Sequence, residues 1–477
     1  MTARAPMEGP AARAALPDPG AYSAVVSRLA GDDTAFDALA LVADDGHLVS
    51  GRTLTVAGHG TAAVLELPDG LEDSATLRDV VAWLGAVPCD VVPCDPVPCD
   101  PVPCGAEPGD AGQQGTVSPG VVALGVFPFD RRAPAFLVVP SIAWCRQADG
   151  TMWRVTVSGG DARSFPTAVA PGVGTPGAAG DTQVATGAFP SVVERPAAAD
   201  YAHAVAAALK EIGAGRLSKV VLSRALEVVC QVAPRPSELL DALWGRDPIF
   251  SPFSLPVRGG RLVGASPELI VSRIGATVTS HPFAGTVALG ALGGDDPAGR
   301  LFASAKDRNE HRLLVDELAG ALRPWCSQLD VPSVPSVVPL RSDARLGSLI
   351  RGTLRPIAWS SSLGTRHSAP SALDLVALLH PTPAVGGVPR PEALEVISLL
   401  EAEPRGYWAG LAGWVDADGN GEWVLAIRSA ILDGRRATLR AGAGIVEGSD
   451  PTAELAETTI KLAPVLDALL AHLPGPA

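Results

Sequence analysis

Four side chains from position 219 onward are of types that could together transfer a water molecule with the help of a metal ion. They are Lys219 in SKVVLSR, Glu268 in GASPEL, Glu310 in DRNEHRLL and Glu457 in AELAETTIK. They supply a candidate base, a candidate acid and two carboxylates, the ligand type that a hard divalent cation prefers.

Glu310 falls on the apolar side of a predicted helix. A step of 100° per residue places Leu313, Leu314 and Ala321 on the same side. A buried carboxylate requires a cation or hydrogen-bond donors, so either a metal or a basic partner is expected. The alternative is a surface glutamate at the edge of the apolar stripe.

The last predicted helix begins at Asp450, a suitable N-cap, followed by Pro451. Within it Glu454, Glu457 and Lys461 are spaced three and four apart and share one face. Such a Glu-Lys pair is most often a solvated contact that contributes a few tenths of a kcal/mol. A role in a site is the alternative.

Three further motifs are ambiguous when each is taken alone. In RAGAGIV, the small residues let backbone N–H groups approach a ligand carboxylate, although a strand bulge explains the glycines equally well. His380 lies between an apolar run and two prolines, where a lone histidine is more often structural than catalytic. Arg428 interrupts an apolar strand and requires an anionic partner, either a protein carboxylate or a substrate.

Regular elements position these residues. A helix in AAADYAHAVAAALKEIGAG precedes the β-branched run LSKVVLSRALEVV, in which Lys219, Val221 and Ser223 share one strand face. Runs of strands with interspersed long helices favour an α+β fold. No GxGxxG follows a first strand and no Walker-type loop is present, so nucleotide binding has little support.

The remaining chain divides by composition. Residues 1–20 are rich in Pro and Ala and are expected to be disordered, residues 21–195 alternate short apolar runs with turns, and 168–190 read as a linker or long loop. A low-complexity loop is predicted at 88–112, where Pro at every fifth position opposes helix and sheet. Metal or disulfide chemistry there is the weaker alternative. The repeat VPCDVVPCDPVPCDPVPCG holds Cys89, Cys94, Cys99 and Cys104, whereas the apolar surroundings of three others predict buried thiols: Cys145, Cys230 and Cys326.

The bulk composition excludes several partners. A chain of 477 residues that is 47% hydrophobic can bury a large core, and its net charge of -14 argues against nucleic acid and anionic membranes. The N-terminus has no unbroken apolar stretch, so a cytoplasmic protein without membrane association is expected.

Nine blocks, in unbroken order over about 196–470, resemble those of the chorismate-utilising enzymes, and most closely those of the isochorismate synthase branch. They are KVVLSR, GASPEL, HPFAGT, SAKDRNEH, LLHPTPAVGG, GWVDADGNGEW, IRSA, RAGAGIV and ELAETTIK. The segment VVALGVFPFDRRAPAFLVVP is similar to the bacterial synthases of siderophore and menaquinone pathways. The resemblance implies an α+β fold of two large, mainly antiparallel sheets packed face to face with helices outside, a chorismate-binding catalytic region over 196–472, a monomer, and Mg²⁺.

The resemblance also implies a role for each candidate. Lys219 would be the general base that activates water for attack at C2 of chorismate, and Glu268 the general acid that protonates the departing C4 hydroxyl. Lys219 must then lose its proton near pH 7, through burial or nearby positive charge, and Glu268 needs a raised pKa. The resemblance further implies that Glu310 and Glu457 bind Mg²⁺, and that Asp307 and Glu454 act on it through water. The residues implied around the ring are Gly285, Thr286, His380 and Lys461. The pyruvyl carboxylate would be bound by Arg428 and by the backbone of Gly442, Ala443 and Gly444.

The lysine at 219 and three further positions separate the branches of the family. Aminodeoxychorismate synthases carry Lys at the place of Ala284, and anthranilate synthases lack the lysine at 219. Salicylate synthases, the runner-up, tend to have Tyr at the place of Trp408 and Leu at the place of Ile427. The apolar residues favour isochorismate as product, although the synthases usually have Phe at 408. A catalytically silent binding protein is the third hypothesis, disfavoured by the four intact chemical residues.

Overall fold

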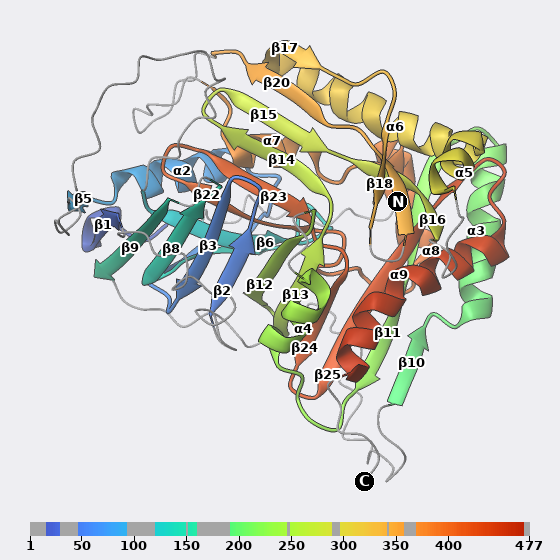
Figure 1. Ribbon diagram of the computed structural model, residues 1–477, viewed down its shortest axis with the longest axis horizontal. Coiled ribbons are helices and arrows are strands. Elements are labelled where there is room, and N and C mark those ends of the chain that lie inside the picture. The colour runs from blue at the N-terminus through green and yellow to red at the C-terminus, as the bar shows by residue number, and fades with distance from the viewer. Residues whose placement is uncertain are drawn as a thin grey trace, which may run out of the picture.

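Two large β-sheets lie against each other with helices around them, as the computed structural model in Figure 1 shows. The structure describes residues 16–28, 46–92, 120–148, 151–159, 191–245, 249–288, 296–340, 343–356 and 369–471. A core cluster of buried side chains takes members from both sheets, among them Val56, Leu255, Leu124 and Trp423. This agrees with the predicted α+β architecture of face-to-face sheets.

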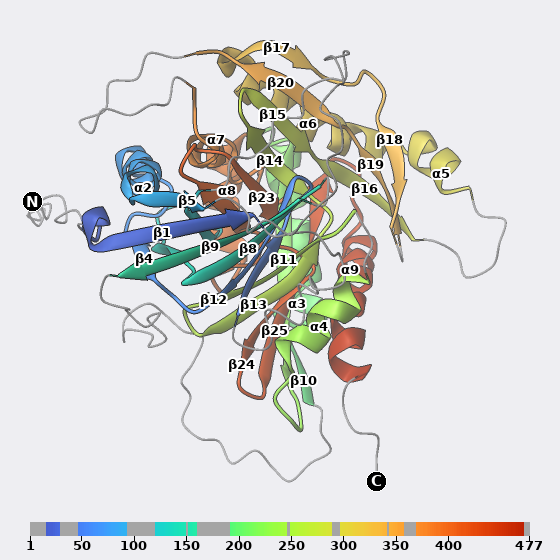
Figure 2. The same cartoon turned by 60° about the vertical axis from the view of Figure 1, so that its left-hand side comes forward.

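The larger sheet holds 13 strands among the described residues and runs from β10 at one edge to β5 at the other (Figures 1 and 2). In spatial order they are β10 (Ser191–Arg195), β11 (Lys219–Val229), β25 (Arg436–Val446), β24 (Ser429–Asp433), β13 (Gly260–Ser266), β12 (Ser251–Val257), β2 (His47–Ser50), β3 (Leu54–His59), β8 (Ile142–Gln147), β9 (Met152–Gly159), β1 (Tyr22–Arg28) and β5 (Cys89–Val92), with β21 (Gly387–Val388) paired to β11.

The second sheet has nine described strands, and a third small sheet lies beside it. The nine are β17 (Cys326–Asp330), β20 (Ile350–Leu354), β15 (Thr277–His281), β14 (Leu269–Ile274), β23 (Gly421–Leu425), β22 (Leu411–Asp416), β6 (Val122–Phe127), β7 (Ala135–Val139) and β4 (Ala63–Leu67). The small sheet is β16 (Phe283–Ala288), β19 (Asp343–Gly347) and β18 (Ser336–Pro339).

Helices cover the outer faces and ends of the sheets. The described α-helices are α2 (Ser74–Ala86), α3 (Ala198–Gly213), α4 (Pro236–Trp244), α5 (Pro297–Ala303), α6 (Ala305–Leu322), α7 (Ala372–Leu379), α8 (Arg390–Leu400) and α9 (Pro451–Ala471), with short 3-10 turns at Pro19–Ala21 and Arg323–Trp325. Asp450 caps α9 as predicted, because its side chain accepts from the backbone N–H groups of Thr452 and Ala453. Helix α9 packs on β25, and α6 packs on β16.

Both large sheets combine strands from the two halves of the chain. In the larger sheet β2 pairs with β12, with Val49 opposite Phe253. In the second sheet β6 pairs with β22, with Phe127 opposite Leu411. Because each pairing joins residues before 195 to residues after 196, the N-terminal segment belongs to the same folded body as the C-terminal region.

The predicted loop at 88–112 is wrong at its start. Cys89–Val92 form strand β5, which pairs in parallel with β1, with Ala24 opposite Cys89. The four residues between Pro88 and Pro93 are free of proline, and this is enough for a short edge strand. The rest of the repeat, with Cys94, Cys99 and Cys104, and the predicted linker at 168–190 lie outside the described residues, as do residues 1–15.

The scattered cysteines confirm the sequence interpretation. Cys145, Cys230 and Cys326 are buried free thiols. Among the helices the structure describes, none has the length and apolar character needed to cross a membrane.

Candidate functional site

A cleft of about 610 Å³ lies where the chain passes between the two large sheets. Two of its walls are connections from one sheet to the other: Glu268 lies between β13 and β14, and Arg428 lies between β23 and β24. The Ala265 N–H donates to the Arg428 carbonyl at 3.2 Å, so the two connections are adjacent. The lining residues are Val221, Glu268, Phe283, Ala284, Gly285, Thr286, Glu310, Arg345, Ala384, Val385, Trp408, Leu425, Ile427, Arg428, Arg440, Ala441, Gly442, Gly444, Glu457 and Lys461.

Lys219, the first residue of β11, is completely buried. Its Nζ lies 3.0 Å from Oε1 of Glu310 on α6, whose side chain is 12% exposed. Within the described part of the chain this ammonium has an ion pair but no well-oriented hydrogen bond. Burial raises the pKa of Glu310, but the neighbouring ammonium groups, Lys219 first, have the larger opposite effect. The pKa of Glu310 therefore lies below its ordinary value. The carboxylate at the edge of the apolar stripe of α6 therefore has a basic partner.

Glu268 has the perturbation expected of an acid. It is 2% exposed, and its Oε1 has no hydrogen-bond partner in the described part of the structure. Burial raises the pKa of Glu268 to about 7, although Arg345 and then Lys219 act in the opposite direction. At this pKa, part of the Glu268 population is protonated near pH 7.

The absence of side chains at two glycines of β25 makes room for this arrangement. A methyl group at Gly444 would overlap Oε1 of Glu310 and would lie 3.1 Å from Cε of Lys219. A methyl group at Gly442 would lie 2.9 Å from the Trp408 ring. The glycines thus permit close approach of side chains to the strand. The sequence alone could not distinguish this role from that of a strand bulge.

Helix α9 and the start of α6 bring the remaining predicted metal ligands to one end of the cleft. Glu457 Oε1 accepts a hydrogen bond from Lys461 Nζ at 2.6 Å, and both side chains line the cleft rather than open solvent. Glu454 is 1% exposed and pairs with Lys306 at 2.7 Å, and its Oε2 has no hydrogen-bond partner among the described residues. Burial, followed by the charge of Glu457, raises the pKa of Glu454.

Asp307 lies next to Gly285. Gly285 has φ +73, and a methyl group there would lie 2.9 Å from Asp307 Cβ. Burial raises the pKa of Asp307. Neither Asp307 nor Glu454 lines the cleft itself, whereas Gly285 and Thr286 do.

Arg428, predicted to lie within an apolar strand, instead lies between β23 and β24, and its expected anionic partner is a protein carboxylate. Its Nη2 lies 3.0 Å from Asp343 Oδ2, and Arg345 Nη2 lies 2.9 Å from the same oxygen. Burial and then Arg345 lower the pKa of Arg428 to about 10. Its backbone has φ 51, a left-handed conformation rare for a side chain of this size and frequent at functional sites. One carboxylate thus balances two guanidinium groups, which leaves a net positive charge at the cleft wall.

Three predicted site residues besides Asp307 and Glu454 do not line the cleft: Lys219, which lies against Glu310 of the cleft wall, His380 and Ala443. His380 is fully buried, its Nε2 lies 3.2 Å from the Pro128 carbonyl oxygen, and its ring meets Phe129 edge-on. Burial lowers the pKa of His380 to about 3, so it stays neutral. Its packing agrees with the structural alternative and does not support contact with the substrate ring. Ala443 belongs to the buried core, so only its backbone is available for the predicted role.

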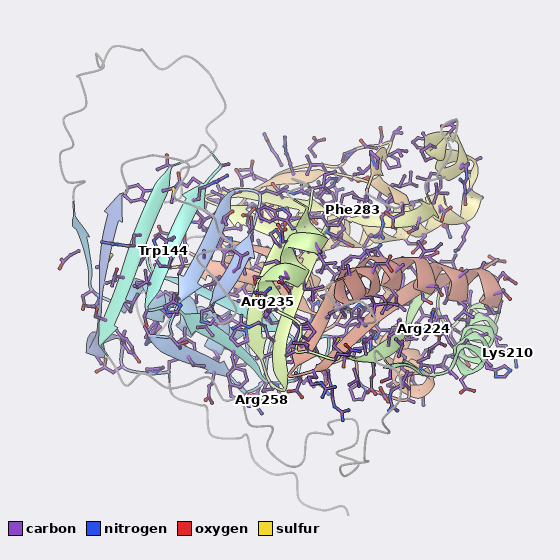
Figure 3. The ribbon with its side chains drawn as sticks, turned by 60° about the horizontal axis from the view of Figure 1, so that its bottom comes forward. Trp144, Lys210, Arg224, Arg235, Arg258 and Phe283 are labelled. Atoms are coloured by element: carbon purple, nitrogen blue, oxygen red, sulfur yellow. The ribbon has the colours of Figure 1, made fainter. Side chains whose placement is uncertain are left out.

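Two cleft-wall residues, Arg345 and Arg440, were missed in the sequence, as was Asp343, the carboxylate that pairs with Arg345 and Arg428. The alternation of Asp343 and Arg345 in an otherwise apolar stretch was a usable strand signal. Arg440 precedes Gly442 and Gly444 by two and four residues, so strand periodicity alone places it on their face. Phe283, labelled in Figure 3, begins β16 and completes this wall.

Comparisons with known proteins show which family the chain belongs to. The sequence model described as "Chorismate binding enzyme" matches residues 175–470. The chain belongs to the chorismate-binding enzyme family. It is 40% identical to isochorismate synthase DhbC of Bacillus subtilis over 289 residues, covering 57% of this chain and 68% of that protein. It is 33% identical to isochorismate synthase EntC of Escherichia coli over 374 residues, covering 76% and 84%.

The fold of this chorismate-binding enzyme also matches a solved structure. The menaquinone-specific isochorismate synthase MenF of Escherichia coli superposes with a TM-score of 0.69 at 20% identity, covering 96% of each chain. At this identity the likeness concerns the fold, so the reaction must be argued from the site. The three positions that separate the family branches, Ala284, Trp408 and Ile427, all line the cleft.

Proposed function

We propose that this chorismate-binding enzyme is an isochorismate synthase. The observation that carries the proposal is a buried carboxylic acid that lines the cleft, together with a buried amine that contacts Glu310, another residue of the cleft wall. Lys219 and Glu268 are 0% and 2% exposed, and each has a polar atom without a hydrogen-bond partner in the described structure. Lys219 is close enough to lower the pKa of Glu268 electrostatically. Buried polar groups left unsatisfied inside a cavity indicate a ligand that completes them.

In the proposed reaction water adds at C2 of chorismate while the C4 hydroxyl departs. Lys219 is ion-paired with Glu310 as an ammonium, so it must first lose its proton; the free amine then accepts a proton from water as the new C2–O bond forms. Both ring double bonds shift and the C4–O bond breaks, with the proton of Glu268 passing to the departing oxygen. Water enters and water leaves, so the product is an isomer of the substrate. The protonated state of Glu268 near pH 7 supports its role as the donor.

Glu310 and Glu457 are the residues that would hold Mg²⁺. Both line the cleft, and the ion pairs recorded for them, with Lys219 and Lys461, involve Oε1 of each. Two carboxylates fit a cation that prefers oxygen ligands and retains several waters. When bound, the ion would bind the ring carboxylate and offset negative charge at this end of the cleft. Glu454, with its unpartnered Oε2, and Asp307 are proposed to act through water.

The other end of the cleft is suited to the second carboxylate of chorismate. Arg428 retains part of its charge because it shares Asp343 with Arg345. Lys461 donates a hydrogen bond to the Gly442 carbonyl at 3.0 Å, which fixes its ammonium beside the ring position, where Gly285 and Thr286 are also proposed to lie. This concentration of basic groups explains how a protein of net charge -14 can bind a dianion.

The test is a product profile. Purified protein is incubated with chorismate, with and without Mg²⁺, and with EDTA, and the products are separated by liquid chromatography. Isochorismate is expected only in the presence of Mg²⁺. Formation of no isochorismate under any of these conditions would exclude the proposal.

Salicylate synthase is the second candidate, because Trp408 is neither the usual residue of the synthases nor that of the salicylate branch. Release of pyruvate, measured by coupling to lactate dehydrogenase in the same reactions, separates the two. Apolar Trp408 and Ile427 at the cleft favour isochorismate as the end product. The expected monomeric state and cytoplasmic location stay predictions.

A further inference from the structure

Arg440 lies between two cavities. It lines the cleft and also a second cavity of about 630 Å³, whose wall includes Tyr201, Glu401 and Glu403. Its side chain is only 8% exposed. A largely buried guanidinium at such a boundary requires anionic partners.

The protein supplies those partners poorly. The carboxylates nearest to Arg440 are Glu401 and Glu403, each 3.8 Å away, too far for a hydrogen bond. Within the described part of the chain, the hydrogen bond recorded for its guanidinium is to Ser223 Oγ at 3.1 Å. Burial lowers the pKa of Arg440, so its neighbours do not fully offset the loss of solvation.

Glu401 is already committed to another arginine. Its Oε1 and Oε2 accept from Nη2 and Nε of Arg405 at 2.6 and 2.8 Å, and Oε1 also accepts from the Ser223 N–H at 2.8 Å. Arg405 in turn donates to the carbonyls of Val385 and Val221. Arg405 is therefore a satisfied structural group, whereas Arg440 retains donors for an anion.

The place of Arg440 along β25 identifies which end of a ligand it meets. Arg440, Gly442 and Gly444 point to one face of the strand, and Gly444 marks the end occupied by Lys219 and Glu310. Arg440 is four residues away, roughly 13 Å along the strand. A ligand whose first carboxylate lies near Glu310 and Glu457 would present its second carboxylate toward this end.

We propose that Arg440 binds the enolpyruvyl carboxylate of chorismate together with Arg428, and so makes the cleft selective for dicarboxylates. This inference rests on the proposed function, which supplies the substrate. Arg428 already shares Asp343 with a second arginine. The guanidinium of Arg440, which is more weakly paired, adds two N–H donors that can bind a carboxylate in a bidentate manner.

The experiment compares two ligands on the same protein. Isothermal titration calorimetry in the presence of Mg²⁺ measures the Kd of 3-(carboxymethoxy)benzoate, which has a ring and a side-chain carboxylate, and of benzoate, which has the ring carboxylate alone. R440Q is expected to weaken the dicarboxylate by about tenfold and to leave benzoate within about twofold, the effect of one charge-assisted contact. R440K keeps the charge but not the fork and is expected to fall between R440Q and wild type.

Arg195→Gln is the matched control, because Arg195 lines the second cavity but not the cleft, and its binding of both ligands should equal wild type. The ratio of the two Kd values within one preparation does not depend on the folded fraction, so partial unfolding of R440Q does not obscure the result. An equal loss for both ligands, or no loss for the dicarboxylate, overturns the proposal. Since binding is measured without turnover, failure of wild type to make isochorismate would remove the proposed function separately.

With chorismate as substrate, R440Q should raise KM about tenfold while kcat changes less than about threefold, since the contact is made in both ground and transition states. A loss confined to kcat would contradict this assignment.

Discussion

The Nζ of Lys219, at the start of β11, lies 3.0 Å from Oε1 of Glu310 on α6. The proposed base and a proposed metal ligand are therefore in direct contact. Gly444 makes this contact possible, since a side chain there would collide with Glu310. Strands β11 and β25 and helix α6, which are distant in sequence, thus meet at one point.

Replacement of Lys219 by Ala is expected to lower kcat for isochorismate formation by roughly 10²–10⁴-fold, the contribution typical of a positioned general base. The measurement is the initial rate at saturating chorismate and Mg²⁺. Lys210→Ala is the control, because Lys210 is exposed on the outer helix α3, where Figure 3 labels it. A K219A enzyme with more than a tenth of wild-type kcat would contradict the base assignment.

The raised pKa of Glu268 predicts that enzyme activity depends on pH. Its pKa in the folded protein is raised by burial from 4.5 to about 7, so the acid form decreases as pH rises through about 7. The value of kcat/KM should therefore decline on the alkaline side of pH 7. Glu268→Gln, which has no proton to give, should lose activity by about 10²-fold or more at every pH.

The same shift has a consequence for stability with a definite sign. Because the folded pKa lies above the unfolded value, the stability contributed by protonated Glu268 is complete below about pH 4.5 and is lost as pH rises through about 7. E268Q should therefore melt at a higher temperature than wild type at pH 8 and at nearly the same temperature at pH 5. Thermal unfolding followed by circular dichroism at both pH values tests this, and a lower melting temperature for E268Q at pH 8 would count against it.

Gly444→Ala is expected to displace Glu310 and so to reduce activity by about tenfold or more, because a misplaced catalytic group loses its alignment. Gly320→Ala is a matched control on α6 itself. A methyl group at Gly320 would meet no atom within 4 Å, so this change should leave activity intact and stabilise the helix by about 0.5–1 kcal/mol. Activity assays of both variants test the effect on the site, and chemical denaturation tests the effect on stability. Equal activity of the two variants would show that Gly444 is replaceable.

Glu310→Gln and Glu457→Gln should each raise the Mg²⁺ concentration for half-maximal activity by about tenfold or more, because each removes one of two charged oxygen ligands. Mg²⁺ titrations of the initial rate provide the measurement. Asp316→Asn is the control, since Asp316 is on α6 but lies in an exposed pair with Arg312. Unchanged Mg²⁺ dependence in both glutamate variants would require other metal ligands.

Local signals predicted several of the elements that carry the cleft residues. The cap at Asp450, the strand beginning at Lys219 and the helix carrying Glu310 depend on periodicity and turn chemistry within a few residues, and all three are observed. Pairing partners could not be read in this way. The partner of Arg428, Asp343, is 85 residues away, and only the tertiary fold brings them together.

Two features depend on segments far away in the chain. The packing of His380 comes from the distant Pro128 and Phe129, which its own sequence block does not reveal. Strand β5 was missed because its partner β1 is far away in sequence, and four residues alone carry little strand signal. Arg440 is a different case, because it was missed although the two-residue period of its strand places it on the face of Gly442 and Gly444.

The interleaving of early and late strands in both sheets governs how the chain can mature during synthesis. When translation has reached residue 195, β2 and β6 still lack β12 and β22, and so display open hydrogen-bonding edges. Such long-range pairing makes folding slow, because distant segments must meet before either sheet is complete. We therefore expect the nascent N-terminal half to expose aggregation-prone strand edges until its partner strands have been synthesised.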